Sequence, residues 1–174
     1  KRISALTDSL NQEGMHIIGV AAKKREIEDA KVFHAEDENN MTFLGIVAFL
    51  DPPKEDAKEA IQGLYQAGVQ VKVISGDAPV VVEHVCGLVG VKDADKQKAV
   101  TGTELDELSE EELSRLVEER DIFARLSPMQ KKRVVNAIQK NGHVVGYMGD
   151  GVNDAPSLHS ADVGISVDNA TDVA

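Results

Sequence analysis

The sequence predicts an α/β protein whose mostly parallel β-sheet is covered by helices on both faces. Short apolar runs alternate with helical segments from residue 54 to the end of the chain. Glycine, proline or a helix-capping residue bounds most of these segments, and a hydrophobic content of 42% is enough to build a core. Repeated strand–helix units of this kind build parallel sheets because each helix returns the chain to the same end of the sheet.

The first part of the chain is expected to hold one helix and two strands. The helical pattern ends at Gly14, and the second strand is stopped by Asp51-Pro52-Pro53. The polar and acidic composition of the segment between the strands predicts a loop or a linker. In order, the expected elements are a helix at 3–12, a strand at 15–22, a loop at 23–40 and a strand at 41–50.

Strands and helices then alternate regularly. Residues 109–112 (Ser-Glu-Glu-Glu) and 127–130 (Ser-Pro-Met-Gln) are capping boxes that mark two helix starts. Gly142 closes the second of these helices. In order, the expected elements are helix 54–67, strand 69–74, helix 79–89, a short strand near 98–101, helix 109–119, strand 121–125, helix 128–141, strand 143–148, helix 156–161 and strand 162–167.

Charge and cysteine usage exclude several classes of protein. A formal net charge of −11 argues against nucleic-acid binding, which needs a basic surface. Much of the negative charge lies in residues 104–121, which we interpret as a solvated helix face. The single cysteine, Cys86, cannot form an internal disulfide, and its apolar helical surroundings predict a buried, unreactive thiol. The longest apolar run, residues 44–50, is far too short to span a bilayer.

Residues 149–156, Gly-Asp-Gly-Val-Asn-Asp-Ala-Pro, are the most informative stretch of the chain. They follow the apolar run at 143–148 and precede a helix, so they lie at the carboxyl end of a strand, where open α/β sheets bind ligands. Asp150 and Asp154 place two carboxylates on this loop. Such a sparse set of hard oxygen ligands suits Mg²⁺, which completes its shell with water and phosphate. The alternative is an Asx-rich turn without a ligand.

Two further strand ends can supply an anion site. Ser75-Gly76-Asp77 offers a hydroxyl and free backbone N–H groups at the start of a helix. Lys131 lies near the start of another helix, where the helix dipole disfavours a cation. A phosphate at about 4 Å would attract the lysine by about 4 kcal/mol per unit charge at an effective dielectric constant of about 20, which outweighs the dipole. These signals converge on one phosphate and one Mg²⁺.

These stretches resemble the P-type cation-transporting ATPases, and through them the haloacid dehalogenase superfamily of phosphotransferases. The resemblance runs from about residue 41 to the end of the chain. It is carried, in the family's order, by Asp51-Pro-Pro-Lys54, Ser75-Gly-Asp77, Phe123-Ala-Arg125 through Lys131, and Gly149–Pro156. Residues 46–54 and 163–168 look most like the bacterial magnesium-transporting members.

The resemblance implies a role for each matched residue, with Mg²⁺ and ATP as cofactors. Asp150 would ligate Mg²⁺, with Asp154 in the same shell or the next. Asp77 and Arg125, together with Lys131, would serve the nucleotide. The residues implied for holding the phosphoryl group are Ser75, the Gly76 amide, Asn153 and Lys131. Ser75 stands where the family usually has threonine, and it keeps the hydroxyl.

The chain departs from the family by lacking its nucleophile. The family's aspartate lies in an Asp-Lys-Thr-Gly-Thr motif that is absent from these 174 residues. We therefore expect a fragment that is inactive by itself, taken from a longer pump that forms an aspartyl-phosphate. Residues 1–40 would be the tail of the nucleotide-binding domain, 41–54 a hinge strand, and 55–174 part of the phosphorylation domain.

The expected partners are ATP and a transported cation, with no nucleic acid. Contact with the membrane would come only through transmembrane helices outside this chain, which makes the fragment a cytoplasmic domain of a bacterial plasma-membrane protein. Calcium and proton pumps are close alternatives. A soluble haloacid dehalogenase-type phosphatase and a non-catalytic regulatory module are others.

The resemblance also implies that the strand bearing the nucleophile is missing from the middle of the sheet. It would lie between the strands expected at 69–74 and 143–148. Unpaired strand edges are costly and recruit other strands. We therefore expect the vacancy to be closed by direct pairing of the two flanking strands, by residues 15–22 or 41–50, or by a strand exchanged in a dimer.

Overall fold

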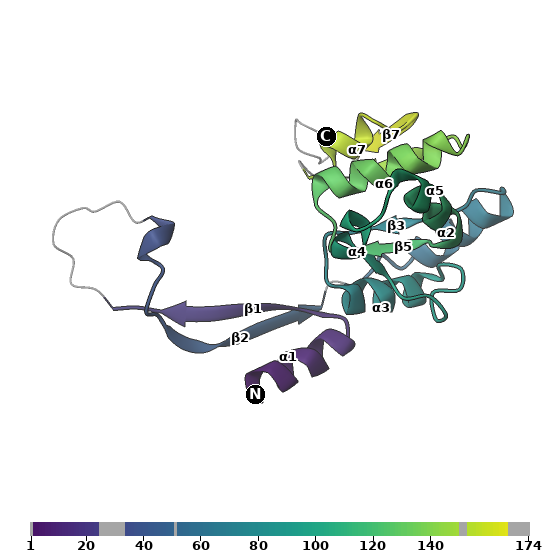
Figure 1. Cartoon of the computed structure of the whole chain (residues 1–174). Helices are drawn as coiled ribbons and strands as arrows, with labels where there is room; N and C mark the ends of the chain where they lie inside the picture. Colours follow the sequence, from purple (N-terminus) through teal and green to yellow (C-terminus); the bar gives the residue numbers. More distant parts are fainter. Residues whose placement is uncertain (1, 25–33, 51, 150–152, 167–174) are drawn as a thin grey trace. The chain divides into compact units, whose positions relative to one another are not determined.

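The computed structural model describes residues 2–24, 34–50, 52–149 and 153–166. The chain divides into two compact units, Lys1–Asp51 and Pro52–Ala174 (Figure 1). Among the described helices, none combines the length and the apolar character that a membrane crossing needs.

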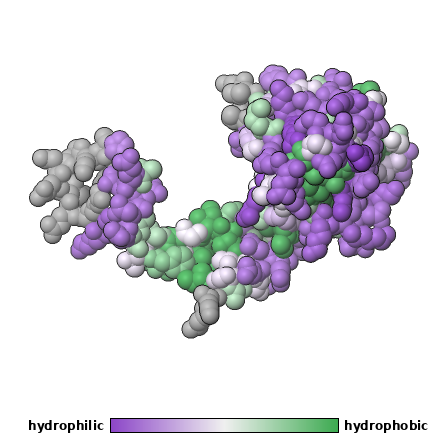
Figure 2. Space-filling view, viewed as in Figure 1, coloured by the Kyte–Doolittle hydropathy of each residue, from purple (hydrophilic) through white to green (hydrophobic). Residues whose placement is uncertain are grey.

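The first unit is a helix followed by an antiparallel hairpin. The strands pair from Met15 opposite Leu50 to Ala22 opposite Thr42, with a bulge between Val20 and Ala21. The hairpin is strongly apolar, as Figure 2 shows, and large side chains such as Phe49 remain 44% exposed. The elements are α1 (Arg2–Gln12), β1 (Met15–Ala22), the 3₁₀ turn η1 (Ala35–Asp37) and β2 (Thr42–Leu50). The predicted helix and both strands are confirmed, and the described part of the expected loop contains η1; residues 25–33 of that loop lie outside the described residues.

The second unit contains two parallel sheets with helices on both faces, which confirms the predicted fold class. One sheet has the order β3–β5–β4, and the other is the pair β6–β7. The elements are α2 (Ala57–Gln66), β3 (Val73–Ile74), α3 (Pro79–Val89), β4 (Val100–Thr101), α4 (Gly102–Asp106), α5 (Glu110–Glu119), β5 (Ile122–Ala124), α6 (Pro128–Lys140), β6 (Gly146–Gly149), α7 (Ala155–Leu158) and β7 (Val163–Ser166).

Alternation along β5 divides the core between two layers. Ile122 and Ala124 pack in a cluster that includes Cys86 of α3, whereas Phe123 packs in another that includes Val134 of α6. Successive strand residues point to opposite faces, so each face of this sheet receives its own helices. A third cluster joins α6 to β6 and α7 through Val135, Tyr147 and Leu158.

Several predicted boundaries were wrong. Helix α2 begins at Ala57 rather than 54, because Ala57 N closes a turn on the Lys54 carbonyl. The strand expected at 69–74 is only Val73–Ile74, since only these two residues have partners on β5. Likewise β6 starts at Gly146, opposite the first residue of β7. The last helix is Ala155–Leu158, shorter than the expected 156–161.

Helix α4 was not predicted. It is five residues long, too short to show a helical period. Its start is nevertheless marked by a capping box: Thr101 Oγ1 accepts from Glu104 N, and the Glu104 carboxylate accepts from Thr101 N at 2.7 Å. The bond that the carboxylate accepts from Thr101 N, and a second one from Thr101 Oγ1, lower the pKa of the Glu104 carboxyl.

Two of the three expected ways of closing the central vacancy are absent. Within the described residues, β3 and β6 belong to different sheets, so the flanking strands do not pair. Among the same residues the hairpin strands pair only with each other, so neither shares a ladder with β3 or β6. The reason lies in the helices: α6 packs on both sheets through side chains and holds them in one unit without a shared ladder. Strand exchange in a dimer stays a prediction.

We expect Ser109→Ala to destabilise the chain by about 1 kcal/mol, the usual cost of losing a helix N-cap. Ser109 Oγ accepts from Glu112 N at 3.3 Å, and Ser109 N donates to the Glu112 carboxylate at 2.9 Å. Ser114→Ala on the same helix is the control, because the buried Ser114 Oγ has no hydrogen-bond partner among the described residues. Urea unfolding measures both, and equal effects would contradict the capping role.

The buried thiol of Cys86 should lower the free energy of unfolding at alkaline pH. Its side chain is 1% exposed, and burial, aided by the charge of Glu83, raises the pKa of the thiol to about 12. Because the unfolded thiol ionises near pH 8.5, the native state loses stability as the pH rises from there toward 12. Between pH 8 and pH 10 the wild type should lose about 2 kcal/mol more than Cys86→Ala. Urea unfolding at both pH values checks this, and parallel losses would exclude a titrating Cys86.

Candidate functional site

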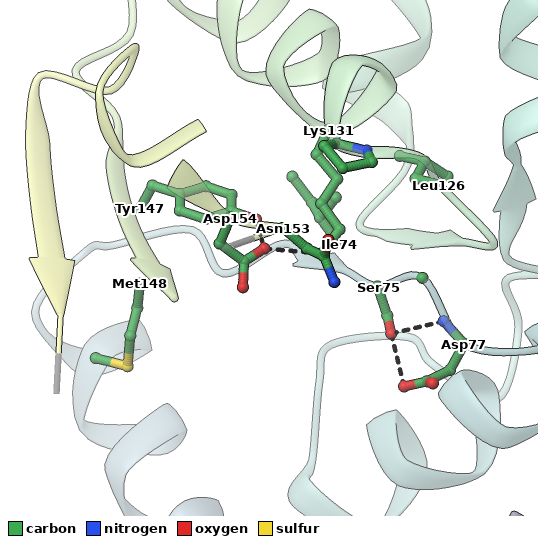
Figure 3. Close-up of a pocket in the computed structure, with 11 residues that line it drawn as sticks. Ile74, Ser75, Asp77, Leu126, Lys131, Tyr147, Met148, Asn153 and Asp154 are labelled. Carbon is green, nitrogen blue, oxygen red and sulfur yellow. Dashed lines mark hydrogen bonds and ion pairs between the residues drawn. The ribbon is translucent and has the colours of Figure 1, made fainter. Parts of the chain in front are cut away.

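A cavity of about 520 Å³ lies at the carboxyl ends of β3, β5 and β6, the end where α/β sheets bind ligands (Figure 3). Its walls come from the turn after β3, the loop into α6, the first turn of α6, and the residues around the β6–α7 connection. The lining residues are Ile74, Ser75, Gly76, Asp77, Leu126, Pro128, Lys131, Tyr147, Met148, Asn153 and Asp154.

The turn after β3 brings a hydroxyl and a carboxylate to the cavity. Ser75 Oγ donates to Asp77 Oδ2 at 2.9 Å, and Asp77 N donates to Ser75 Oγ at 3.1 Å. The backbone of Ser75 is bonded on both sides, to the Phe123 carbonyl at 2.9 Å and from Leu126 N at 3.0 Å. The turn is thus fixed to β5 and the loop after it. Before Ser75 can donate to an anion, its hydroxyl group must rotate and give up the hydrogen bond to the Asp77 carboxylate.

Lys131 is a buried cation at the start of α6. Its side chain is 10% exposed, and Nζ lies 2.8 Å from Asp154 Oδ1. A buried ammonium needs a partner of opposite charge, and the helix dipole adds to that need. The sequence suggested a phosphate as the fixed anion near Lys131, whereas the structure supplies Asp154. The cap that begins the helix, Ser127 accepting from Gln130 N, fixes the point from which Lys131 extends.

Asp154 lies at the centre of the site. Its Oδ1 accepts from Lys131 Nζ and from the Tyr147 hydroxyl at 2.9 Å. In the described part of the chain no group bonds to Oδ2. Gly149 makes room for this carboxylate, because a Cβ at that position would lie 2.6 Å from Asp154 Cβ. Gly149 is therefore required by close approach, whereas a Cβ on Gly146 would meet only the Val163 carbonyl at 3.9 Å.

Arg125 adopts a left-handed backbone conformation, with φ of 57°. Its N–H donates to the Asp77 carbonyl at 2.9 Å, so this backbone joins the loop before α6 to the turn after β3. The side chain is exposed, does not line the cavity, and makes no hydrogen bond or ion pair within the described residues.

The structure brings most of the predicted site residues together. The predicted residues that line one cavity are Ser75, Gly76, Asp77, Lys131, Asn153 and Asp154. Arg125 adjoins this group through its backbone, and Asp150 lies outside the described residues. The roles assigned to these residues stay predictions.

Sequence reasoning missed Tyr147. It treated residues 143–148 as a uniformly buried strand, although a tyrosine in such a strand needs a partner for its hydroxyl. Burial raises the pKa of the Tyr147 hydroxyl well above its usual value, and the hydrogen bond to Asp154 and its charge act in the same direction. The nearby Ser157 hydroxyl opposes this shift, although it makes no hydrogen bond of normal geometry. The signal in the sequence was the tyrosine itself, because a tyrosine in an apolar strand needs a hydrogen-bond partner for its hydroxyl.

The described residues do not form a complete metal site. They contain no group of three or more His, Cys, Asp or Glu side chains placed to hold a metal ion. Asp154 Oδ2 and the Asn153 side chain are hard donors at the cavity, which fits Mg²⁺ with water and phosphate completing its shell. The donor chemistry excludes a closed structural zinc site in these residues.

Comparison with known proteins identifies the family. The model of haloacid dehalogenase-like hydrolases matches residues 8–162. The chain is 47% identical to a magnesium-transporting P-type ATPase of Salmonella typhimurium, over 98% of this chain and 18% of that protein. It is 42% identical to the Escherichia coli K12 protein of the same name, over 100% of this chain and 19% of the relative.

A calcium-transporting ATPase of Listeria monocytogenes is 40% identical over 87% of this chain and 17% of its own length. The chain thus spans about a fifth of the curated relatives that it matches. The resemblance noted in the sequence is confirmed: the chain belongs to the haloacid dehalogenase-like hydrolases, and within them it is similar to the magnesium-transporting P-type ATPases.

Proposed function

We propose that this chain is the phosphorylation-domain part of an ATP-driven cation pump, with Mg²⁺ as the transported ion. The observation that carries the proposal is the Lys131–Asp154 pair, which faces the Ser75–Gly76 turn across one cavity at the carboxyl ends of the strands. A buried cation, a hydroxyl and a partly free carboxylate around one cavity suit the positioning and charge stabilisation of a phosphoryl group. The similarity to magnesium-transporting P-type ATPases supports the choice of ion.

In this proposal each side chain has a separate task. Lys131 offsets negative charge on the transferring phosphoryl group, and Ser75, the Gly76 amide and Asn153 orient its oxygens. Asp150 and Asp154 hold Mg²⁺, which supplies charge neutralisation at the phosphoryl oxygens when bound. The residues proposed to serve ATP are Asp77, Arg125 and Lys131.

The chain itself would not complete the reaction. The nucleophile would be an aspartate of an Asp-Lys-Thr-Gly-Thr motif elsewhere in the full-length protein, and this chain has no such motif. We assign residues 1–40 to the tail of the nucleotide-binding domain, 41–54 to a hinge strand and 55–174 to the phosphorylation domain. The whole would be a cytoplasmic part of a bacterial plasma-membrane protein.

A calcium pump is the second candidate, because a calcium-transporting ATPase also matches at 40% identity. The two candidates differ in the ion that the full-length protein carries. Uptake of radioactive Ca²⁺, compared with a fluorescent Mg²⁺ indicator, in vesicles that contain the full-length protein separates them.

We expect the 174-residue chain to incorporate no phosphate from labelled ATP, because a covalent intermediate needs a nucleophile that is absent. Incubation with γ-labelled ATP and Mg²⁺, followed by acid precipitation, tests this, with the full-length protein as the positive control. Acid-stable label on the short chain would show that some other residue is phosphorylated.

In the full-length protein, Lys131→Ala and Asp150→Asn should each slow phosphoenzyme formation about 10²-fold or more, the usual cost of one electrostatic group at a transition state. Lys132→Ala is the control: it removes the same charge as Lys131→Ala from the neighbouring residue, which does not line the cavity. This variant should retain the wild-type rate. Rapid-quench measurements at saturating Mg²⁺ check all three. Wild-type rates in either site variant would refute the role assigned to that residue.

A further inference from the structure

Tyr147 shares one oxygen of Asp154 with Lys131 (Figure 3). The phenol donates to Asp154 Oδ1 at 2.9 Å, and Lys131 Nζ lies 2.8 Å from the same atom. Tyr147 lies in β6, Lys131 lies in α6, and Asp154 directly precedes α7. The proposed function gives tasks to Lys131 and Asp154 but none to the tyrosine between them and the core.

We propose that Tyr147 is a positioning residue: its hydroxyl holds the Asp154 carboxylate in place when Lys131 turns toward a phosphate. This inference rests on the proposed function. An ammonium that approaches a phosphoryl group must share or give up its bond to Asp154 Oδ1. The phenol keeps that oxygen bonded, so the carboxylate, whose Oδ2 has no partner in the described residues, keeps its orientation.

The two donors differ in mobility. Lysine carries three donors on a flexible stem, so Nζ can rotate between partners. Tyr147 is 8% exposed, and its ring packs in the cluster with Val135 and Leu158. Its hydroxyl is therefore held at one point by the core. A fixed donor and a movable donor on one oxygen allow Lys131 to change partners without releasing Asp154.

The phenol donates to a charged acceptor although a neutral hydroxyl lies near it. That hydroxyl belongs to Ser157, which is buried and makes no hydrogen bond of normal geometry in the described residues. The phenol instead donates to the one charged group of the cavity that Lys131 also contacts.

The contact can be tested in the chain itself by tyrosine fluorescence. The chain has two tyrosines and no tryptophan, so Tyr65→Phe leaves Tyr147 as the main fluorophore. A phenol that donates to a carboxylate emits weakly, so Asp154→Asn in this background should raise the emission clearly. Lys131→Ala removes the other donor but keeps the carboxylate, and it should leave the emission low. Unchanged emission in Asp154→Asn would overturn the proposal.

The positioning role is tested in the full-length protein. Tyr147→Phe should slow phosphoenzyme formation about tenfold, the loss expected for one hydrogen bond to a charged group. It should raise the Mg²⁺ concentration needed for half-maximal rate and leave the KM for ATP unchanged. Tyr65→Phe, which removes the hydroxyl that accepts from Lys92 N far along the chain, should change none of these values.

A double-mutant cycle completes the test. Because Tyr147 acts through Asp154, Tyr147→Phe should cost little more in an Asp154→Asn background. Wild-type kinetics in Tyr147→Phe, or full additivity with Asp154→Asn, would overturn the positioning role. If the wild-type full-length protein forms no phosphoenzyme, the proposed function fails, and the fluorescence result alone then decides whether Tyr147 holds Asp154.

Discussion

The packing of α6 is the constraint on which the second unit depends. Within the described residues no backbone ladder joins the β3–β5–β4 sheet to the β6–β7 pair. Val134 and Val135 are adjacent in sequence and about 100° apart around the helix, so one helix enters two cores. Val134 packs with Phe123, and Val135 packs with Tyr147 and Leu158. The side chains of α6 therefore fix the position of one sheet relative to the other.

The same helix carries the charge of the site. Lys131 extends from its first turn to Asp154 on the other side of the cavity. The distance between the turn after β3 and Asp154 is thus set by hydrophobic packing and one ion pair. A change in the α6 core would move these two parts of the candidate site relative to each other, because no described strand forms hydrogen bonds between them.

A second buried ion pair, at the opposite end of β5, shows what distinguishes the candidate site. Lys72 Nζ lies 2.8 Å from Asp121 Oδ1, and both side chains are 11% exposed. Gln70 and Gln97 also donate to this carboxylate, so both of its oxygens have partners. Asp154 keeps one oxygen without a partner in the described residues. A buried ion pair lies at each end of β5. Only at the end with the cavity does the carboxylate keep an oxygen without a hydrogen-bond partner in the described residues.

Local signals in the sequence predicted much of this arrangement. Capping boxes at Ser109 and Ser127 located two helix starts, and β1 was predicted at its observed residues. Strand ends were harder, because the run at 69–74 looks like one strand but only Val73 and Ile74 have ladder partners on β5. The strand-end residues of the site could be picked out of the sequence, and the family resemblance supplied the roles expected of them. The pairing of Lys131 with Asp154 and the part played by Tyr147 were not, since they depend on how α6 packs in three dimensions.

The backbone of Arg125 has a consequence for how this sequence can vary. A left-handed conformation costs a residue with a Cβ about 1 kcal/mol or more, and glycine pays no such penalty. Selection for stability alone would therefore favour glycine at position 125, since the arginine side chain is exposed and makes no hydrogen bond or ion pair with the described residues. A library screened only for thermal tolerance would therefore enrich glycine at this position. The arginine that stands there carries a cost that folding alone does not explain.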